Sequence, residues 1–308
     1  MARRQRAVVT GGAGFVGSHL VDRLVADGWA VLVVDDLSTG QAGDVPAVAT
    51  LEQLDIATDP IQGVVAPWRP SVVFHLAAQA SAPLSMRDPE RDLAVNVIGT
   101  HRVAAAAHEA GADRLVFVSS GGAIYGETLR PATESTRPAP SSYYGIHKLA
   151  AEGHVALAGL PYAIARPSNI YGPRQRAGLE GAVVATFVEL ARRGAPLTID
   201  GDGAQTRDLV HVRDVVDALC RLGLDNAGSG IWNVASGRRI SVASLANRIE
   251  RVAGVPLGRV WRPVRAGDVR HSAMSPARLR ALGWSPSVGL TDGIRELLER
   301  PTGNATAG

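Results

Sequence analysis

Lysine and cysteine are almost absent from this 308-residue chain, which contains one of each. A single cysteine, Cys220, cannot form a disulfide within the chain, so the sequence favours a reducing compartment and we expect a cytoplasmic protein. Aromatic residues make up only 5% of the sequence and do not accompany a basic stripe. This composition argues against a nucleic-acid partner, because such surfaces combine clustered basic residues with aromatic side chains.

The sequence also lacks long apolar runs and metal-binding patterns. No apolar run approaches the length of a membrane span, and residues 1–12 have no signal-peptide core, so we expect no membrane partner. The eight histidines show no metal-ligand spacing, so no metal site is predicted. What is present, 46% apolar and 20% charged residues with a net charge of +3, is typical of a globular protein. The length indicates two domains, or one large α/β domain with an appendage.

The single lysine, Lys148, lies four residues after Tyr144, whereas the chain uses arginine for its other permanent positive charges. On a helix this spacing places both side chains on one face. A nearby ammonium lowers the pKa of a tyrosine from roughly 10 toward neutrality, so that the phenol can act as a general base or acid. A planar guanidinium could not replace a compact ammonium there. We therefore interpret Tyr144 and Lys148 as a catalytic pair rather than a chance pair on a solvated helix.

Near the N-terminus, a strand, a glycine-rich turn and a helix are predicted in close succession. Ala7–Thr10 is a short apolar run of strand type, and Gly11, Gly14 and Gly17 follow it before a helical pattern begins. Glycines in this context allow the backbone to approach a pyrophosphate at the helix N-terminus. The motif therefore favours a dinucleotide site over a turn that is merely tight.

The second predicted strand, residues 30–34, ends at two acidic residues, Asp35 and Asp36. Asp35 lies eighteen residues after Gly17, where an acidic side chain accepts hydrogen bonds from the adenosine ribose and repels a 2′-phosphate. The spacing predicts NAD rather than NADP, with Asp35 as the ribose ligand. Capping of the next turn is the alternative role for either aspartate.

Further strands and helices alternate in the order that a parallel sheet requires. Strands are predicted at residues 51–54, 72–76, 115–118, 162–166 and 231–234, and helices at 89–110, 183–193, 212–222 and 241–253. Asn96 lies in an apolar stretch of the first of these helices, so we expect its amide to have buried partners. The predicted fold class is α/β: a Rossmann-type doubly wound parallel sheet with a smaller, interleaved C-terminal substrate domain.

The predicted domain boundaries follow from a change after residue 166, where strands and helices no longer alternate regularly. Residues 1–166 are predicted to form the NAD-binding domain, completed by a return segment at about 207–236. Residues 167–206 and 237–300 are predicted to form the substrate domain, and residues 301–308 a flexible tail.

In this order, the motifs resemble those of the extended short-chain dehydrogenase/reductases, the NAD-dependent sugar epimerase/dehydratase family. The resemblance covers about residues 7–286, and within the family the chain is most similar to the bacterial UDP-glucose (UDP-galactose) 4-epimerases. The segments that carry it are residues 10–17, Asp35, 55–56, 74–78, 96–100, 119–126, 144–148, 166–172, 206–214 and 265–268.

The resemblance implies a role for each matching residue. The NAD site would comprise Gly11, Gly14, Phe15, Val16, Gly17, Asp35, Asp36, Asp55, Ile56, Leu76, Ala77, Ala78, Asn96, Ser119, Tyr144 and Lys148. The nucleotide-sugar site would comprise Ser120, Tyr144, Asn169, Arg207, Arg265, Asp268 and Ser272, with Asn169 and the two arginines on the diphosphate. Relatives form dimers through two helices per subunit, here residues 89–110 and 142–158, so a homodimer is expected.

The chain departs from the family pattern at Gly121, where the catalytic hydroxyl usually stands. Ser120 precedes it and is expected to substitute, as the third catalytic residue beside Tyr144 and Lys148. Asp200 stands where relatives often have an aromatic residue near the base, which leaves the identity of the nucleotide open.

The reaction that the resemblance implies is inversion at C4 of a nucleotide sugar. It consists of transient oxidation to a 4-keto sugar, rotation of that sugar in the pocket, and return of the hydride to the opposite face. Dehydratases and decarboxylases of the family carry extra carboxylates in the loop that here reads Gly121-Gly122-Ala123, so this loop favours epimerisation. The alternatives are a 4-ketoreductase, a dehydratase, a UDP-glucuronate 4-epimerase and, from a different class, a catalytically silent NAD-binding regulatory protein.

Overall fold

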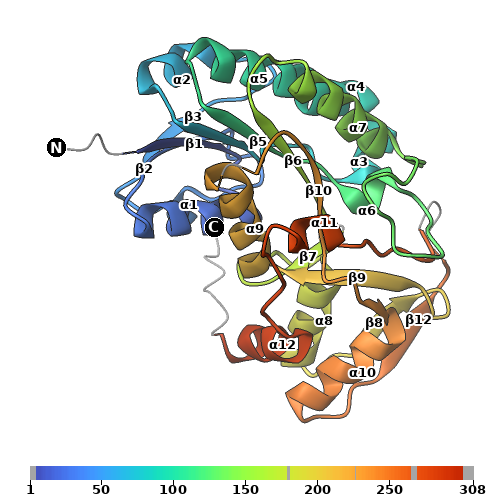
Figure 1. The fold of residues 1–308 in the computed structure, drawn as a ribbon. Coiled ribbons are helices and arrows are strands. Elements are labelled where there is room, and N and C mark those ends of the chain that lie inside the picture. The colour runs from blue at the N-terminus through green and yellow to red at the C-terminus, as the bar shows by residue number, and fades with distance from the viewer. Residues whose placement is uncertain (1–4, 179–180, 226, 265–268, 301–308) are drawn as a thin grey trace.

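The computed structural model describes residues 5–178, 181–225, 227–264 and 269–300 (Figure 1). Its main sheet contains β1 (Arg6–Thr10), β2 (Ala30–Asp35), β3 (Thr50–Gln53), β4 (Val72–His75), β5 (Arg114–Val118), β6 (Tyr162–Pro167) and β10 (Gly230–Val234). The strand order is β10-β6-β5-β4-β1-β2-β3, and every neighbouring pair is parallel. The strand order reverses direction beside β1, as in doubly wound dinucleotide-binding sheets. The predicted fold class is confirmed.

Helices cover both faces of this sheet: α1 (Phe15–Ala26) and α9 (Val212–Leu224) on one, and α2 (Gln62–Trp68), α5 (Thr100–Glu109) and α7 (Tyr143–Ala156) on the other (Figure 1). Successive strand residues point to opposite faces. Val9 belongs to the buried cluster that contains Leu20 of α1, whereas Val8 belongs to the cluster that contains Val103 of α5. Burial on both faces is why the strands read as nearly continuous apolar runs.

The helix predicted at residues 89–110 is divided into α4 (Pro89–Leu93), a π-helical stretch η2 (Ala94–Gly99) and α5. The Thr100 hydroxyl donates to the Asn96 carbonyl at 2.7 Å, and a side chain inserted into the backbone ladder disturbs its regular spacing. Asn96 therefore lies in a locally widened helix, a feature that is frequent at functional sites.

The smaller half of the molecule, in the lower part of Figure 1, has its own sheets and core. Strands β7 (Asn169–Tyr171), β9 (Thr206–His211) and β11 (Arg239–Ser241) form one sheet, and β8 (Leu197–Asp200) pairs with β12 (Arg259–Arg262). Helices α8 (Val183–Arg192), α10 (Val242–Ala253) and α12 (Leu290–Glu299) contribute to the core beside them. The remaining short elements are η1 (Ala42–Asp44), α3 (Ala82–Arg87), α6 (Gly121–Ile124) and α11 (Ala277–Arg280).

The predicted return segment, residues 207–236, is shared between the two halves. Helix α9 and strand β10 pack with the main sheet, whereas β9 lies in the small sheet between β7 and β11. The domain boundaries themselves stay predictions, and the predicted tail, residues 301–308, lies outside the described residues.

Candidate active site

The carboxyl ends of the parallel strands carry most of the predicted site residues. Gly11 follows β1, Ala77 follows β4, and Ser119 and Ser120 follow β5. At Gly11 the φ angle is +70°, and a Cβ there would lie 2.5 Å from the backbone nitrogen of Ala77. The glycine loop and the segment after β4 are therefore in direct contact, at the sheet edge where open α/β sheets bind their ligands.

The glycine loop leads directly into the first turn of α1. Gly14 is the N-cap and provides no side-chain cap, and Phe15 and Val16 begin the helix with partly exposed side chains. A Cβ at Gly17 would lie 2.0 Å from the carbonyl oxygen of Gly11, so only glycine allows this close approach of helix and loop. Uncapped N–H groups at a helix N-terminus are suited to an anionic group such as a pyrophosphate.

Asp35 ends β2 and is only 7% exposed. Its two carboxylate oxygens accept hydrogen bonds from the backbone N–H groups of Ala13 and Leu37, both at 2.9 Å. Burial raises the pKa of Asp35, and these two hydrogen bonds oppose that effect. The carboxylate is thus fixed against the glycine loop, and its remaining lone pairs can accept from ribose hydroxyls.

Next to it, Asp36 and Asp55 converge on one arginine. The Arg91 Nη2 lies 3.0 Å from Asp55 Oδ2 and 3.8 Å from Asp36 Oδ2. Ile56, predicted with Asp55 at the adenine, is 4% exposed, and a Cβ at Gly99 of η2 would collide with its side chain. The structure therefore brings the predicted adenosine residues together.

The predicted catalytic residues lie on α7. Ser142 caps this helix by accepting from the N–H of Gly145 at 3.2 Å, and the N–H of Tyr144 donates to Ser85 Oγ at 2.9 Å. Tyr144 is partly exposed, whereas Lys148, one helical turn later, is 1% exposed. Both the spacing and the burial agree with the predicted pair.

The environment of Lys148 is apolar on one side and acidic on the other. Its Nζ lies 4.2 Å from the centroid of the Phe117 ring. Burial lowers the pKa of Lys148 to about 7, and the carboxylates of Glu152 and Asp92 oppose that effect. A lysine tuned in this way lies where a small environmental change alters its charge near neutral pH.

The structure separates the two adjacent serines, Ser119 and Ser120. Ser119 Oγ is buried and donates to Glu152 Oε1 at 2.6 Å, while Arg166 donates to both oxygens of the same carboxylate at 2.8 and 2.5 Å. Ser120 is partly exposed, and its hydroxyl makes no hydrogen bond within the described part of the chain. Of the two, Ser120 is therefore the hydroxyl that can reach a substrate.

The missing hydroxyl at Gly121 has a steric counterpart in the C-terminal segment. A Cβ on Gly121 would lie 2.0 Å from the Sδ of Met274 and 3.3 Å from the Arg166 carbonyl oxygen. Met274 is 1% exposed and packs in a small cluster with Tyr125. Any side chain at position 121 would have to displace this thioether.

A chain of buried hydrogen bonds joins β1 to η2 behind these residues. Thr10 Oγ1 and His75 Nδ1 are 2.7 Å apart, and His75 Nε2 and Thr100 Oγ1 are 2.9 Å apart. Burial lowers the pKa of His75 to about 3, so the ring is neutral. Because the Thr100 hydroxyl donates to Asn96, the imidazole must donate from Nε2.

On the substrate side, the structure describes only part of the predicted set. Asn169 begins β7 and Arg207 lies in the adjacent β9, both partly exposed. The N–H of Ser272 donates to the Thr206 carbonyl at 3.3 Å, which places Ser272 beside Arg207. Arg265 and Asp268 lie outside the described residues.

Four polar residues at this edge were not predicted as site residues: Gln79, Asp92, His147 and Glu152. Glu152 lies four residues after Lys148, and Asp92 four residues before Asn96, so each shares a helix face with a predicted residue. That spacing is the signal from which they could have been found. No local pattern marks the contact between Asp92 and His147, which are 55 residues apart.

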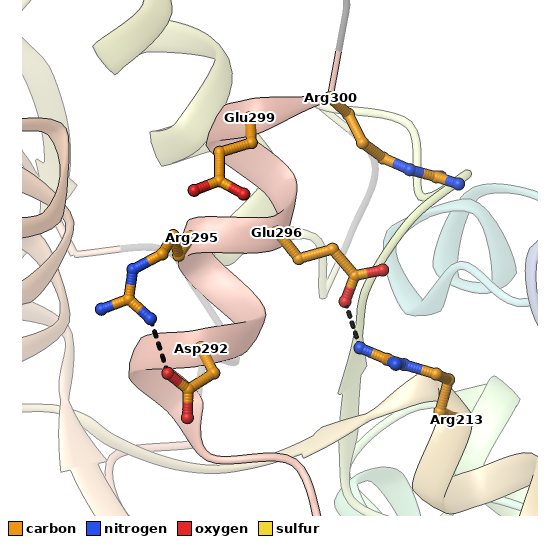
Figure 2. Close-up of a pocket in the computed structure, with 6 residues that line it drawn as sticks. All are labelled: Arg213, Asp292, Arg295, Glu296, Glu299 and Arg300. Atoms are coloured by element: carbon orange, nitrogen blue, oxygen red, sulfur yellow. Dashed lines mark hydrogen bonds and ion pairs between the residues drawn. The ribbon is translucent and has the colours of Figure 1, made fainter.

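A surface hollow lies away from this edge, between α9 and α12. Figure 2 shows its six charged lining residues: Arg213, Asp292, Arg295, Glu296, Glu299 and Arg300. Its volume is about 430 Å³, and ion pairs within it join Arg295 to Asp292 at 2.6 Å and Arg213 to Glu296 at 2.5 Å. None of the predicted site residues lines it, so we interpret it as an ion-paired surface depression.

The described residues contain no group of three or more histidine, cysteine or acidic side chains that could hold a metal ion. The described helices include none that is long and apolar enough to cross a membrane.

The fold and the sheet edge define a dinucleotide-binding α/β protein, and the similarity of the chain to known proteins agrees with this class. The model of the NAD dependent epimerase/dehydratase family matches residues 7–235. A UDP-glucose 4-epimerase of Mycolicibacterium smegmatis is 41% identical over 305 residues, covering 96% of this chain and 97% of that protein.

Solved structures extend the similarity to the whole fold. The UDP-glucose 4-epimerase of Thermotoga maritima with UDP-glucose superimposes with a TM-score of 0.92 at 38% identity, covering 96% of this chain and 98% of that one. A UDP-N-acetylglucosamine 4-epimerase of Methanobrevibacter ruminantium, in complex with UDP-N-acetylmuramic acid, gives a TM-score of 0.89 at 29% identity and the same coverage.

This chain belongs to the NAD-dependent epimerase/dehydratase family. The sequence-based predictions of the family, of NAD as cofactor and of nucleotide-sugar 4-epimerisation as the function are thereby confirmed. The roles of individual residues stay predictions.

Proposed function

We propose that this protein interconverts the C4 epimers of a UDP-sugar, with UDP-glucose and UDP-galactose as its substrates, and that Tyr144, Lys148 and Ser120 carry the reaction. The observation that supports this most strongly is the placement of the only lysine. Lys148 is fully buried one turn after the partly exposed Tyr144, at the carboxyl edge of a dinucleotide-binding sheet. The similarity to UDP-glucose 4-epimerases over nearly the whole chain supports the choice of sugar.

The residues of the proposed cofactor site are suited to binding NAD. Gly11, Gly14 and Gly17 form a cradle that a Cβ at Gly11 or Gly17 would fill. Asp35 is fixed beside this cradle, and its carboxylate can accept further hydrogen bonds. Asn96 Oδ1 is buried without a hydrogen-bond partner among the described residues, and a buried acceptor of this kind calls for a donor. Leu76, Ala77 and Ala78 are partly exposed beside the glycine loop.

When bound, NAD supplies the acceptor and then the donor of the hydride that leaves and returns at C4. Tyr144 takes the proton of the C4 hydroxyl and gives it back to the epimerised sugar, as a general base and then a general acid. Lys148 favours the phenolate by its charge, and Ser120 donates to the C4 oxygen. Asn169, Arg207 and Arg265 bind the diphosphate, and Asp268 serves the nucleotide ribose.

The loop after β5 favours epimerisation over elimination or decarboxylation. Its residues Gly121, Gly122 and Ala123 carry no carboxylate, and Met274 occupies the space that a side chain at position 121 would need. A 4-ketoreductase or a UDP-glucuronate 4-epimerase needs no further acid in this loop, so both remain outcomes of the test below.

We also propose that the protein is a homodimer. Large apolar side chains are at least 39% exposed on helices that neighbour one another: Leu84 and Met86 on α3, Leu93 on α4, Ile98 on η2, and Tyr143 and Ile146 on α7. Exposed apolar side chains gathered on neighbouring elements are typical of an association site. A second copy of the chain would cover it, and sedimentation of the purified protein measures this directly. Cytoplasmic location stays a prediction from the single cysteine.

The experiment that tests the function is a screen of UDP-, dTDP- and GDP-sugars by NMR, without added cofactor. We expect inversion at C4 of UDP-glucose to reach equilibrium, because NAD bound during expression is regenerated in each cycle. A requirement for stoichiometric NADPH would indicate a ketoreductase instead, and loss of water from C5 and C6 would indicate a dehydratase. Inversion of UDP-glucuronate alone would keep the chemistry and change the sugar.

A further inference from the structure

Asp92 is a buried carboxylate to which the proposed chemistry gives no role. It lies on α4 and its side chain is 0% exposed. Transfer of an ionised carboxylate out of water costs several kcal/mol unless hydrogen bonds and opposite charges compensate it. The partners that compensate this carboxylate therefore indicate what it does.

Three donors from three separate segments converge on Asp92. Gln79 Nε2 and Asn96 Nδ2 donate to Oδ1 at 2.6 and 3.0 Å, and His147 Nδ1 donates to Oδ2 at 2.6 Å. Hydrogen bonds to an ionised acceptor are roughly twice as strong as neutral ones. A single side chain thus joins the segment after β4, the π-helical stretch η2 and helix α7.

The segment after β4 is held tightly by the same residues. Gln79 Oε1 accepts from the N–H of Ser81 at 2.7 Å, and its Nε2 also donates to the Ser81 carbonyl at 2.8 Å. The Asn96 amide donates to the Gln79 carbonyl at 2.9 Å. This segment begins at Ala77 and Ala78, which lie beside the glycine loop, so its position determines the shape of the proposed cofactor site.

The other end of the link reaches the catalytic helix. His147 precedes Lys148 directly, and its side chain is 12% exposed. The Asp92 carboxylate also acts on Lys148 through its charge, in the direction that favours the ammonium. Besides Tyr144, its proposed partner one turn earlier, the titratable groups that act on this ammonium include Glu152 on α7 and His75 on β4, and His75 is neutral.

We propose that Asp92 and His147 are positioning residues of the epimerase reaction. Asp92 holds the cofactor-facing segment 77–81 and the catalytic helix in one register through its hydrogen bonds to Gln79 and His147. This inference rests on the proposed roles of Tyr144 and Lys148.

The test compares Asp92→Asn with Glu90→Gln, which removes an exposed carboxylate from the same short helix. For Asp92→Asn we expect kcat to fall about ten- to a hundredfold, the scale of a small misplacement of reacting groups, with KM nearly unchanged. We also expect less NAD per subunit after purification.

The same variant should change the pH dependence. Loss of the Asp92 carboxylate lowers the pKa of Lys148, so the ammonium is lost at lower pH. The fall of kcat at alkaline pH, the alkaline limb of its profile, should therefore begin at a lower pH than in the wild type. Glu90→Gln should change none of these.

His147 provides a second test that does not disturb a fully buried group. His147→Asn keeps a donor near the position of Nδ1, whereas His147→Ala removes it. We expect the asparagine variant to retain most of kcat and the alanine variant to lose about tenfold, with the alkaline limb unmoved in both because Asp92 remains.

A purely structural role would give a different result. If Asp92→Asn lowers only the thermal unfolding midpoint, while kcat per folded subunit, NAD content and the alkaline limb match the wild type, the inference is wrong. Equal activities of His147→Asn and His147→Ala would also contradict it. If the wild type epimerises no sugar, the proposed function fails, but the comparison of NAD content between Asp92→Asn and the wild type still tests the link.

Discussion

The half built on the seven-stranded sheet and the half built on the small sheets hold their proposed site residues in different ways. In the first, Lys148, Glu152 and Arg166 are 1%, 5% and 3% exposed and lie in a connected set of hydrogen bonds and charges. In the second, Asn169 and Arg207 are partly exposed on strands of three and six residues.

The difference has a physical meaning for an epimerase. Proton and hydride transfer require atoms held within fractions of an ångström, and buried polar networks supply that order. Choice of sugar requires only that a pocket accept one shape and reject another, which costs one to three kcal/mol for a small group. Changes in the sheet half should therefore impair every substrate equally, whereas changes in the small half should alter the preference among sugars.

The largest expected effect is that of Tyr144→Phe. Without the phenolic hydroxyl no group takes the C4 proton, so kcat should fall at least about a hundredfold for every sugar, the usual scale of a positioned general base. NAD should stay bound. The matched control is Tyr143→Phe, the exposed neighbour on the same helix. Near-normal turnover by folded Tyr144→Phe would remove this tyrosine from the mechanism.

Lys148→Arg should be nearly as inactive as Lys148→Ala, with kcat within about tenfold of the alanine variant. The ammonium is buried at 4.2 Å from the Phe117 ring centroid, so the larger planar guanidinium cannot be accommodated without displacement of its neighbours. Steady-state kinetics of both variants on the same sugar decide this. An arginine variant that keeps most of the wild-type activity would show that only the charge matters.

The main sheet could be predicted from the sequence because its strands, apart from the exposed β3, are largely buried apolar runs, and the proposed site residues lie near the ends of several of them. Gly11 directly follows β1, Asp35 ends β2, and Ser120 comes two residues after β5. The two small sheets could not be predicted in this way. Strands β11 and β12 have three and four residues, none of them buried, so no alternation of apolar and polar residues distinguishes them from loops. The link between Asp92 and His147 depends on tertiary packing, which no local pattern encodes.

Asp35→Ala should have a smaller effect, confined to the cofactor. Loss of the carboxylate removes repulsion of a 2′-phosphate, so discrimination against NADP should weaken at least about tenfold, since juxtaposed like charges cost several kcal/mol. Affinities of the two cofactors for stripped protein measure this. Glu52→Ala is the matched control, because Glu52 is an exposed carboxylate on the neighbouring strand β3 and is not among the predicted NAD residues. Wild-type protein purified with NADP would overturn the assignment.

The smallest effect, and the one that tests the small half, is expected at Ser272. By the family resemblance this position borders the C2 substituent of the sugar, where a small side chain leaves room for an N-acetyl group. Capping of the helix that follows is the competing role, but α11 begins at Ala277 with Pro276 as its N-cap and has no side-chain cap. Ser272 is 9% exposed and lies beside Arg207, a proposed ligand of the diphosphate.

We therefore expect the wild type to accept UDP-N-acetylglucosamine, with kcat/KM for the two sugars within about a hundredfold, the range that one steric contact controls. Ser272→Tyr should fill the space and lower kcat/KM selectively for the N-acetyl sugar, leaving UDP-glucose turnover nearly intact, while Ser272→Ala should leave both unchanged. A preference of the wild type for UDP-glucose beyond a hundredfold would place the steric barrier on another residue. Equal losses on both sugars in Ser272→Tyr would contradict the proposed division of roles between the two halves, because the small half would then control the chemistry as well as the choice of substrate.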